Sequence, residues 1–502
     1  MTDSWAQVRS DAGGARTDVS GASVGEVEDR LSRIAKNFRG AVVSPDHPEY
    51  DRSRKVWNAM YDDRYPAAIL RCADGNDVSH ALRCLSGTAL PIAVRGGGHH
   101  IAGYGGCDVG FVVDLSAMRR VEPTADGNRM VVQGGATLHD VDIIGDQIGR
   151  AVPLGVVSPT GVGGLALSGG IGWLTRRHGY TCDNILSAEV VTPSGEIVRA
   201  ADAENPDLLW ALRGGGGNFG VVTMFEFACH PVREVHVAEA YHLVRDEGHL
   251  GDILRFYRDW TADLPRDVTA WIAVEHASAY HELLPSGSTR KLVATLAVAC
   301  IGSSSRKTEQ LLRPVTREQS PAATRESVMT LLELQHSQDD SGAAALGMRS
   351  YMKGEMITEL TDDVIAGIAE HSIALPTRNS LFEMGMVGGA MQDWDEMDAA
   401  VGLRSAAYLA GFSMMSGDEE DDIPSGIEWA RAGWSTLLAG SAGGVYLNFS
   451  GDETEERVYS SLGARSVLKR ERIREIKGRY DPENMLRNNH NIRPRVKESS
   501  QQ

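Results

Sequence analysis

The amino-acid sequence predicts an α+β protein of two or three domains, with a glycine-dense module in its first half. The chain has 502 residues, of which 42% are hydrophobic, enough for a sizeable core. Of its 55 glycines, 26 lie between Pro91 and Gly220. In that half, stretches typical of strands and helices alternate, whereas longer helical stretches and apolar runs follow His230. The glycines have no three-residue period, which excludes a collagen-like chain.

The first half predicts a small βαβ unit followed by further strands. Val27, Leu31 and Ile34 have the spacing of a short amphipathic helix over residues 24–37. The elements expected next, in chain order, are a strand at 67–70 (AAIL), a helix at 77–85, a strand at 91–98 (PIAVRGGG), and strands at 110–115, 129–135 and 188–198. The last is expected to be a hairpin, because Pro-Ser-Gly at 193–195 lies between two β-branched runs.

After His230 the sequence predicts a second domain of longer elements. The stretch at 248–264 predicts a helix, and apolar runs such as KLVATLAVACI at 291–301 alternate with stretches of this kind. Near Tyr446 we expect a short strand, followed by amphipathic helices through Ile476.

Charge and cysteine usage exclude several classes of protein. Lys and Arg total 50 against 68 Asp and Glu, a formal net charge of −18, so neither nucleic acid nor a membrane surface is an expected partner. We find no apolar run of the ~20 residues that span a bilayer and no secretory signal, and therefore expect a cytoplasmic protein with a short floppy leader. The six cysteines form no CxxC pair, so neither a disulfide framework nor a metal site is expected.

Three glycine-rich segments, each at the end of a predicted strand, indicate one extended ligand. They are RGGGHHIAGYGG (95–106), SPTGVGGLALSGGIGWL (158–174) and WALRGGGGNFGVV (210–222). Glycine lets backbone N–H groups approach an anion or a flat ring without interference from a Cβ atom. A single such loop is equally compatible with a tight turn that binds nothing, but three together predict a ligand that lies across several loops. The second segment departs from the Rossmann pattern, so a nicotinamide site is not expected.

His99 and His100 directly follow the first glycine run. An isolated loop histidine is most often an ordinary polar residue. Here the glycines bring the backbone against the expected ligand, so an adjacent imidazole could reach a cofactor carbon as a nucleophile. Spacing alone does not establish a covalent bond.

As a set and in this order, six segments resemble the FAD-linked oxidases of the berberine bridge enzyme-like family, whose flavin domain is of the vanillyl-alcohol-oxidase type. The segments are VRGGGHHIAG (94–103), FVVDLSAMRRV (111–121), SPTGVGGLALSGGIGWLTRRHGYTCDNILSAEVVTPSGEIV (158–198), DLLWALRGGGGNFGVVT (207–223), VYLNFSGDE (445–453) and KGRYDPENMLRNNHNI (477–492). The bacterial hydroxynicotine-oxidase-like members look most similar. The resemblance implies a leader and first helix (1–35), a two-part FAD-binding domain (36–232), a substrate-binding domain with an antiparallel sheet covered by helices (233–444), and a C-terminal segment that returns to the FAD domain (445–502).

The resemblance also implies that FAD is the cofactor and that His99 carries it through the flavin 8α-methyl group, a linkage associated in this family with a raised redox potential. The residues expected to bind the cofactor are Arg95, Gly96, Gly97, Gly98, His99, His100, Gly103, Thr160, Gly163, Gly164, Gly169, Gly170, Gly172, Asp183, Asn184, Gly217, Asn218, Gly220, Val221, Val222, Asn448, Asn488 and Asn491. Bicovalent members carry a second attachment at a Cys before the GxGG loop, where this chain has Val157, Ser158 and Pro159. Attachment through His99 alone is therefore implied, and Cys182, in a later turn, is expected to be a buried structural thiol.

Three residues are candidates for acid–base catalysis. Many relatives use the second Tyr of a YxNY segment as a base, but this chain has Phe449 there, which leaves Tyr446, expected on the opposite face of the strand. The GGAM motif and the later Arg404 match in spacing a segment of the plant enzymes that supplies a catalytic carboxylate. This match implies that Asp393 lies at or near the position of that carboxylate. Glu383, on the predicted strand at 380–394, is a second candidate. A carboxylate beside an aromatic ring and out of bulk water would have a raised pKa. For Tyr446 the alternative is a packing residue with a hydrogen-bonded hydroxyl, and for each carboxylate a turn cap or an Arg partner.

The function that these observations predict is an FAD-dependent oxidase acting on a small organic molecule, such as a secondary metabolite. It would remove a hydride from a C–H next to O or N and pass the electrons to O2, giving H2O2. Val162 lies in the loop expected beside the ring, where a small residue in relatives leaves room for O2. The alternatives are a tailoring flavoenzyme that oxidises an alcohol or closes a ring in natural-product biosynthesis, and a non-catalytic flavin-binding protein. The sequence leaves the substrate and the oligomeric state open, and a homodimer is compatible with it.

Overall fold

The predicted βαβ unit forms the core of a four-stranded sheet with the order β1-β2-β4-β3. Strand β4 (Phe111–Asp114) pairs in parallel with both β2 (Ala68–Arg71) and β3 (Ile92–Arg95), so it lies between the two strands of the unit. Helix α4 (Gly75–Leu85) connects β2 to β3, and the Asp74 carboxylate caps its first turn by accepting hydrogen bonds from the amides of Asn76 and Asp77. All four side chains of β4 are buried, as expected for a central parallel strand.

An antiparallel five-stranded sheet follows in the same half of the chain, with the order β5-β6-β10-β8-β9. Its strands are β5 (Val121–Pro123), β6 (Arg129–Gln133), β8 (Ile185–Val191), β9 (Ile197–Ala201) and β10 (Val221–Ala228). The predicted hairpin is formed by β8 and β9, and Gly195 in its turn has a φ of +80°, which accounts for glycine at that position. The first glycine-rich loop follows β3 and the third leads into β10, whereas the second lies between β7 (Arg150–Ala151) and β8 and contains helix α6 (Val162–Leu167), so it is not at a strand end as expected.

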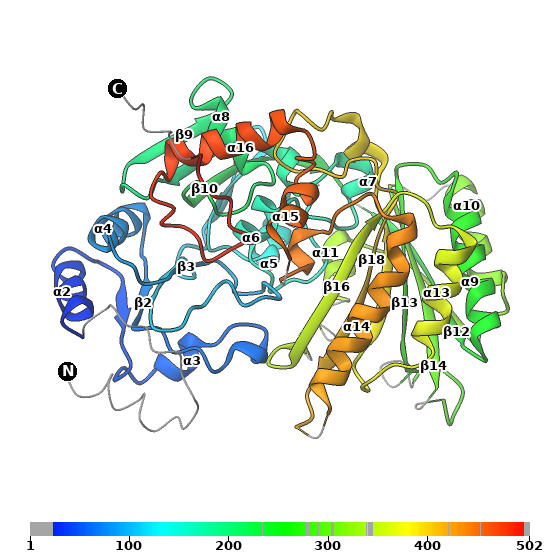
Figure 1. Cartoon of the computed structure of the whole chain (residues 1–502). Coiled ribbons are helices and arrows are strands. Elements are labelled where there is room, and N and C mark those ends of the chain that lie inside the picture. Colours follow the sequence, from blue (N-terminus) through cyan, green and yellow to red (C-terminus); the bar gives the residue numbers. More distant parts are fainter. Residues whose placement is uncertain are drawn as a thin grey trace.

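A seven-stranded antiparallel sheet with the order β15-β12-β14-β13-β17-β18-β16 dominates the second half of the chain. Its strands are β12 (Val235–Leu243), β13 (Val268–His276), β14 (Leu292–Ile301), β15 (Ala323–Met329), β16 (Arg349–Ile357), β17 (Leu381–Met386) and β18 (Tyr408–Ser416). Helices α9 (Glu247–Thr261), α10 (Arg306–Arg317), α13 (Asp362–Ser372) and α14 (Ile423–Leu437) cover one face of it (Figure 1). The fold is thus α+β, with an antiparallel sheet under helices as the resemblance implies.

The opposite face of this sheet packs against the glycine-dense half of the chain, as Figure 1 shows. Trp173 and Leu174, from the second glycine-rich segment, cluster with Val235 and Ala299 of the sheet. The alternation of side chains along a strand therefore sorts the sheet residues into a helix-covered set and a set that faces the glycine loops.

The remaining elements connect these layers or close their ends. They are α2 (Val24–Ala35), α3 (Tyr50–Arg54), α5 (Leu138–Ile148), α6 (Val162–Leu167), α7 (Thr175–His178), α8 (Pro206–Leu212), α11 (Leu331–His336), α15 (Glu455–Ser461), α16 (Val467–Tyr480), β7 (Arg150–Ala151), β11 (His230–Pro231), and short 3-10 helices at Ala59–Tyr61, Thr181–Asn184, Gly389–Asp393, Leu438–Gly440 and Leu447–Phe449.

One predicted strand is wrong in part and another is wrong altogether. The stretch at 380–394 is a strand only over Leu381–Met386, because Gly388 and Gly389 then adopt positive φ angles and the chain enters a 3-10 helix. The segment after Tyr446 is a 3-10 helix, not a strand. Since this helix has three residues per turn, Tyr446 and Phe449 lie on the same side, with ring centroids 5.0 Å apart, and not on opposite faces as expected.

The structure is a computed structural model that describes residues 24–232, 234–277, 282–288, 291–302, 306–337, 339, 345–419, 421–451 and 453–495. The expected leader at 1–23 lies outside these residues. Among them, no helix is both long and apolar enough to cross a membrane. The same residues contain no group of three or more His, Cys, Asp or Glu side chains that could hold a metal ion.

Candidate active site

The three glycine-rich loops meet in space. Gly97 of the first loop and Gly161 of the second approach so closely that a Cβ atom on either would overlap the backbone of the other. The second and third loops are joined by a hydrogen bond from the Gly216 amide to the Leu167 carbonyl, 2.8 Å long. Segments far apart in the sequence therefore form one continuous surface of exposed backbone, as a ligand lying across several loops requires.

This surface leaves room for such a ligand. A Cβ atom added to Gly164 or to Gly217 would meet no other atom within 4 Å, so both glycines border open space. The side-chain oxygens of Asn489 and Asn491 are buried without a hydrogen-bond partner in the described part of the chain. A buried polar atom without a partner is costly, and a bound molecule with hydrogen-bond donors would satisfy it. The site thus fits an extended polar cofactor such as FAD.

The imidazole of His99 is available for a reaction with a ligand. It lies in the loop directly after β3, beside the indole of Trp57, with ring centroids 6.0 Å apart and an interplanar angle of 26°. Within the described residues, neither of its ring nitrogens takes part in a hydrogen bond. Burial lowers the pKa of His99 to about 4, so the ring is neutral near pH 7 and keeps a nitrogen lone pair, as a nucleophile must.

The neighbouring His100 is used for packing. Its Nδ1 accepts a hydrogen bond of 3.1 Å from the amide of Ala102. Its ring centroid lies 4.6 Å from that of Tyr104 and 5.4 Å from that of His490. Burial, together with His490, lowers the pKa of His100 to about 3. The structure therefore separates two histidines that the sequence could not distinguish.

The C-terminal tail after α16 ties the first glycine loop to the third. Asn488 Nδ2 donates to the carbonyls of Tyr104 and Gly106, 3.0 and 3.1 Å away. Asn218, in the third loop, donates to the His490 carbonyl and accepts from the Ile492 amide. The tail thus returns to the glycine loops, and the expected residues Asn218 and Asn488 hold the loops together within the protein.

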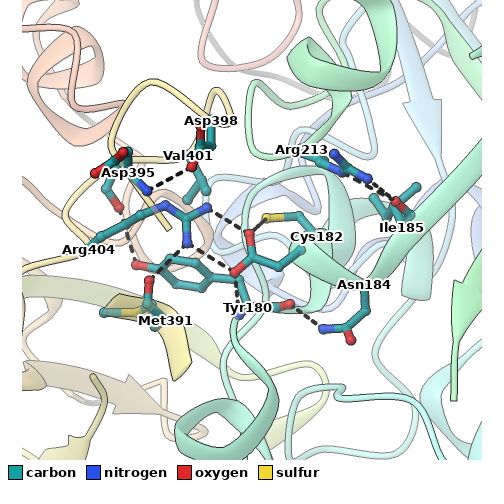
Figure 2. Close-up of polar contacts among 12 residues, drawn as sticks. Tyr180, Cys182, Asn184, Ile185, Arg213, Met391, Asp395, Asp398, Val401 and Arg404 are labelled. Atoms are coloured by element: carbon teal, nitrogen blue, oxygen red, sulfur yellow. Dashed lines mark hydrogen bonds and ion pairs between the residues drawn. The ribbon is translucent and has the colours of Figure 1, made fainter. Parts of the chain in front are cut away.

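Asp183 and Asn184 are engaged with other parts of the protein. Figure 2 shows Asn184 directed toward Tyr180, and Arg404 beside the ring of the same tyrosine. The Asp183 carboxylate forms a bidentate ion pair with Arg404, with N–O distances of 2.7 and 3.1 Å, and also accepts from the Tyr180 amide. These side chains are only 2% and 3% exposed. Asn184 donates to the carbonyls of His178 and Tyr180. The polar contacts of both residues hold the turn at 180–184, so their assignment to the flavin stays a prediction.

Cys182 lies in the same turn and is fully buried. Its Sγ contacts Asp183 Oδ1 at 3.8 Å, and burial raises the pKa of the thiol well above its usual range. A protonated, inaccessible thiol is a poor nucleophile.

Tyr446 is buried with its hydroxyl oxygen hydrogen-bonded inside the protein. The oxygen accepts from the Ile171 amide at 3.1 Å and from Asn448 Nδ2 at 2.9 Å. Burial raises its pKa above the ordinary tyrosine value. Asn448 Nδ2 lies 3.3 Å from the carbonyl of Leu165 in α6. These contacts favour the packing interpretation of Tyr446, which joins the turn at 447–449 to the second glycine loop.

The expectation of a desolvated carboxylate with a raised pKa is wrong for Asp393. This residue ends a surface 3-10 helix and forms a bidentate pair with Arg266, with N–O distances of 2.6 and 2.7 Å and side chains 54% and 53% exposed. The hydrogen bonds from Arg266 lower the pKa of Asp393. The physical reason is the glycine turn at Gly388 and Gly389, which carries the chain off the sheet before residue 393. The alternative of an Arg partner is the correct one.

Glu383 lies on β17, on the sheet face that packs against the glycine loops. It is paired in register with Ala273 of β13 and Gly411 of β18. Burial, followed by the charge of Glu275, raises the pKa of Glu383 to about 7. In the described part of the chain no hydrogen bond or ion pair reaches its carboxylate. It therefore has the properties expected of a general base.

Several of the other expected cofactor residues have explanations within the protein. Arg95 Nε donates to the Gly105 carbonyl at 2.9 Å, while its Nη2 is buried without a partner. A Cβ atom on Gly103, Gly170 or Gly220 would overlap the side chains of Tyr61, Thr181 or Val190, and one on Gly172 would overlap the Leu154 carbonyl. The buried side chains of Val221 and Val222 begin β10. The remaining expected residues, Gly96, Gly98, Thr160, Gly163 and Gly169, belong to the loops that meet.

Trp57 and Asn58 lie beside the loop of His99, although no sequence motif contains them. Asn58 is fully buried, and its Nδ2 donates to the carbonyls of Ile101 and Ser350, both at 2.7 Å. It thereby links the loop of His99 to β16 of the seven-stranded sheet. The two residues belong to no glycine run or periodic segment, so no sequence pattern marked them.

Comparison with known proteins agrees with this geometry. An FAD binding domain model matches residues 66–201, and a model described as "Berberine and berberine like" matches residues 469–493. An FAD-linked oxidoreductase of Dictyostelium discoideum is 26% identical over 467 residues, covering 92% of this chain and 97% of that protein. (R)-6-hydroxynicotine oxidase of Paenarthrobacter nicotinovorans is 38% identical over 190 residues, covering 38% of this chain and 41% of its own length.

A solved structure shows the same fold. Glucooligosaccharide oxidase from Acremonium strictum, a protein with 6-S-cysteinyl, 8α-N1-histidyl FAD, superposes with a TM-score of 0.80 at 22% identity, covering 93% of this chain and all of that chain (100%). The regions that the two family models match contain the βαβ unit, the first two glycine loops and the returning C-terminal tail. The chain therefore contains an FAD-binding domain, has a fold of the vanillyl-alcohol-oxidase type, and resembles FAD-linked oxidoreductases of the berberine bridge enzyme-like kind.

Proposed function

We propose that this protein removes a hydride from a C–H next to O or N of a small organic substrate, with O2 as the electron acceptor and H2O2 as a product. Bound FAD would supply the acceptor for the two electrons. The observation that carries the proposal is the position of an unpaired carboxylate with a raised pKa, Glu383, on the sheet face toward the glycine loops. The substrate would lie between that face and the loops.

We also propose that FAD is attached through His99 alone. The neutral imidazole of His99 has no competing hydrogen bond among the described residues, whereas His100 accepts one from Ala102. The second attachment known from bicovalent relatives would need a thiol near Ser158, and Cys182 is buried against Asp183. A single covalent link is what these side chains support.

In this proposal Glu383 accepts the proton that the substrate releases. At pH values below 7 the carboxyl group is mostly protonated and cannot accept a proton, and at higher pH it is ionised. Among the described residues, the titratable side chains on its face of the sheet are Glu275 of β13, Glu239 and Tyr241 of β12, and Arg325 of β15.

The redox chemistry can be tested with the purified holoenzyme. Under anaerobic conditions, a panel of small alcohols and amines should include a donor that bleaches the flavin absorbance near 450 nm, a wavelength characteristic of oxidised flavins. Admission of air should restore the colour within seconds and release one H2O2 per flavin. Failure of every donor to reduce the flavin, or reoxidation over minutes, would contradict the proposed oxidase.

Glu383→Gln should lower kcat/KM for an accepted donor by about 10²- to 10⁴-fold, the usual contribution of a general base. In the unchanged protein, kcat/KM should rise with pH through about 7, because Glu383 must lose its proton to act. The variant should lose this rise. The pH profile is the decisive measurement, since a merely structural role would not remove it.

Asp393→Asn is the matched control for this substitution. It makes the same change from carboxylate to amide at a surface pair with Arg266, outside the candidate site. Its activity and pH profile should equal those of the unchanged protein. An unaltered profile in Glu383→Gln would remove Glu383 from the proposed mechanism.

A further inference from the structure

A short segment at Trp57 and Asn58 joins the loop of His99 to the edge of the seven-stranded sheet. On the loop side, the Trp57 amide donates to the Gly98 carbonyl at 3.0 Å. The Asn58 side chain donates from Nδ2 to the Ile101 carbonyl at 2.7 Å. The two carbonyls belong to the residue directly before His99 and to the second residue after it. The backbone on both sides of His99 is therefore held by one segment from an earlier part of the chain.

On the sheet side, the same segment is bonded to β16 and to the residues just before it. Asn58 Nδ2 also donates to the Ser350 carbonyl at 2.7 Å, and its Oδ1 accepts from the Ser350 amide at 3.0 Å and from the Met60 amide at 3.1 Å. The Ala59 amide donates to the Met348 carbonyl at 3.0 Å. Because Asn58 is 0% exposed, a single buried amide bonds the first glycine loop to the edge strand of the sheet.

The chemistry of this contact requires an amide at position 58. Its nitrogen donates two hydrogen bonds, to Ile101 and Ser350, while its oxygen accepts from backbone amides. An ionised carboxylate has no proton to donate, and a methyl group would leave both carbonyls without this partner. The glycines at 96–98 restrict the backbone before His99 very little, and Gly98 has a φ of +70°. Bonds from outside the loop therefore fix its conformation.

We propose that Asn58 is a positioning residue for the covalent attachment of FAD, because it fixes the loop from which His99 reaches the flavin. The inference rests on the proposed attachment through His99 and assigns the residue that makes it efficient. In the attachment, a nitrogen–carbon bond replaces the N–H bond of the imidazole and one C–H bond of the flavin methyl group. The two protons and two electrons pass to the flavin ring and then to O2, which becomes H2O2. A displacement of the imidazole by about 1 Å can slow such a reaction about 100-fold.

The test follows covalent flavin and total flavin separately, in samples taken at intervals after expression begins. Asn58→Asp removes both donors with little change of shape. Covalent flavin per polypeptide, measured by mass spectrometry, should rise at least about tenfold more slowly in this variant than in the unchanged protein. Total flavin in the folded fraction should stay close to stoichiometric, with most of it released by acid. A merely structural role would lower both quantities together.

Two further variants isolate the effect of the amide. Asn58→Ala removes it without adding a charge and should slow attachment to the same extent. Gln335→Glu is the matched control, since it also turns a buried amide into a carboxylate, but Gln335 lies on α11 and donates to the Gly155 carbonyl at 2.6 Å. This control should lose stability and still attach flavin at the rate of the unchanged protein.

An unchanged rate in Asn58→Asp or Asn58→Ala, an equal delay in Gln335→Glu, or a parallel loss of total flavin in the Asn58 variants would overturn the assignment. If the unchanged protein itself carries no covalent flavin, the proposed attachment through His99 fails as well. Covalent flavin at His99 that forms equally fast in every variant refutes this inference alone. None of these measurements requires a substrate, so they hold or fail independently of the proposed oxidase reaction.

Discussion

Replacing His99 with alanine is expected to abolish covalent attachment of the flavin completely. The imidazole lies in the loop where the glycine segments meet, it is neutral near pH 7, and no hydrogen bond from the described residues occupies its nitrogens. The unchanged protein should have a mass one FAD above that of its polypeptide, keep its yellow colour after acid precipitation, and fluoresce on a denaturing gel. The variant should show none of these properties.

His100→Ala is the matched control, because it removes the adjacent imidazole from the same loop. His100 packs against Tyr104 and His490 and accepts a hydrogen bond from Ala102, so its loss should loosen the loop without breaking the bond to the flavin. Covalent flavin should persist in most molecules of this variant. Retention of the bond in His99→Ala, with loss in His100→Ala, would exchange the two assignments.

Arg404→Met should cause the largest loss of stability among single substitutions around the candidate site. It leaves the Asp183 carboxylate uncompensated at 2% exposure, and breaking a buried pair in this way costs about 3–5 kcal/mol. The loss should appear in urea unfolding followed by tryptophan fluorescence, compared at equal flavin content. The double variant Asp183→Asn with Arg404→Met should recover part of it, since no buried charge then remains.

The surface pair of Arg266 and Asp393 provides the comparison. It has the same residue types and the same bidentate geometry, but both side chains are more than half exposed. Water screens such a pair, so Arg266→Met should lower the stability far less than Arg404→Met does. A loss in Arg266→Met as large as that in Arg404→Met would show that burial does not set the energy of these pairs.

The fold of the glycine-dense half could be predicted because its signals are local. Periodicity and turn chemistry placed the βαβ unit and the hairpin of β8 and β9, and the structure confirms both. The failures lie where a local conformation changes within an apolar stretch. The strand ending at Met386 and the 3-10 turn at Leu447–Phe449 depend on glycine φ angles and on packing between distant segments, which short-range patterns do not contain.

The candidate site could be predicted in part for the same reason. Glycine content marked the three loops, and their order supported the resemblance from which FAD was inferred. The choice between Asp393 and Glu383 required the tertiary arrangement of the seven-stranded sheet. Solvent exposure and the proximity of Glu275 decide which carboxylate has a raised pKa, and both depend on that arrangement. Trp57 and Asn58 reach the loop of His99 only through the tertiary fold.

The sequence by itself determined that this protein has a glycine-dense module suited to a large cofactor, followed by a second region of longer helices and strands. Backbone freedom and hydrophobic periodicity are properties of short segments, and they can be recognised before the chain is folded. The tertiary structure decided which imidazole is available, which carboxylate is desolvated, and which polar atoms remain without partners. These depend on what surrounds a side chain, and residues hundreds of positions away supply the surroundings.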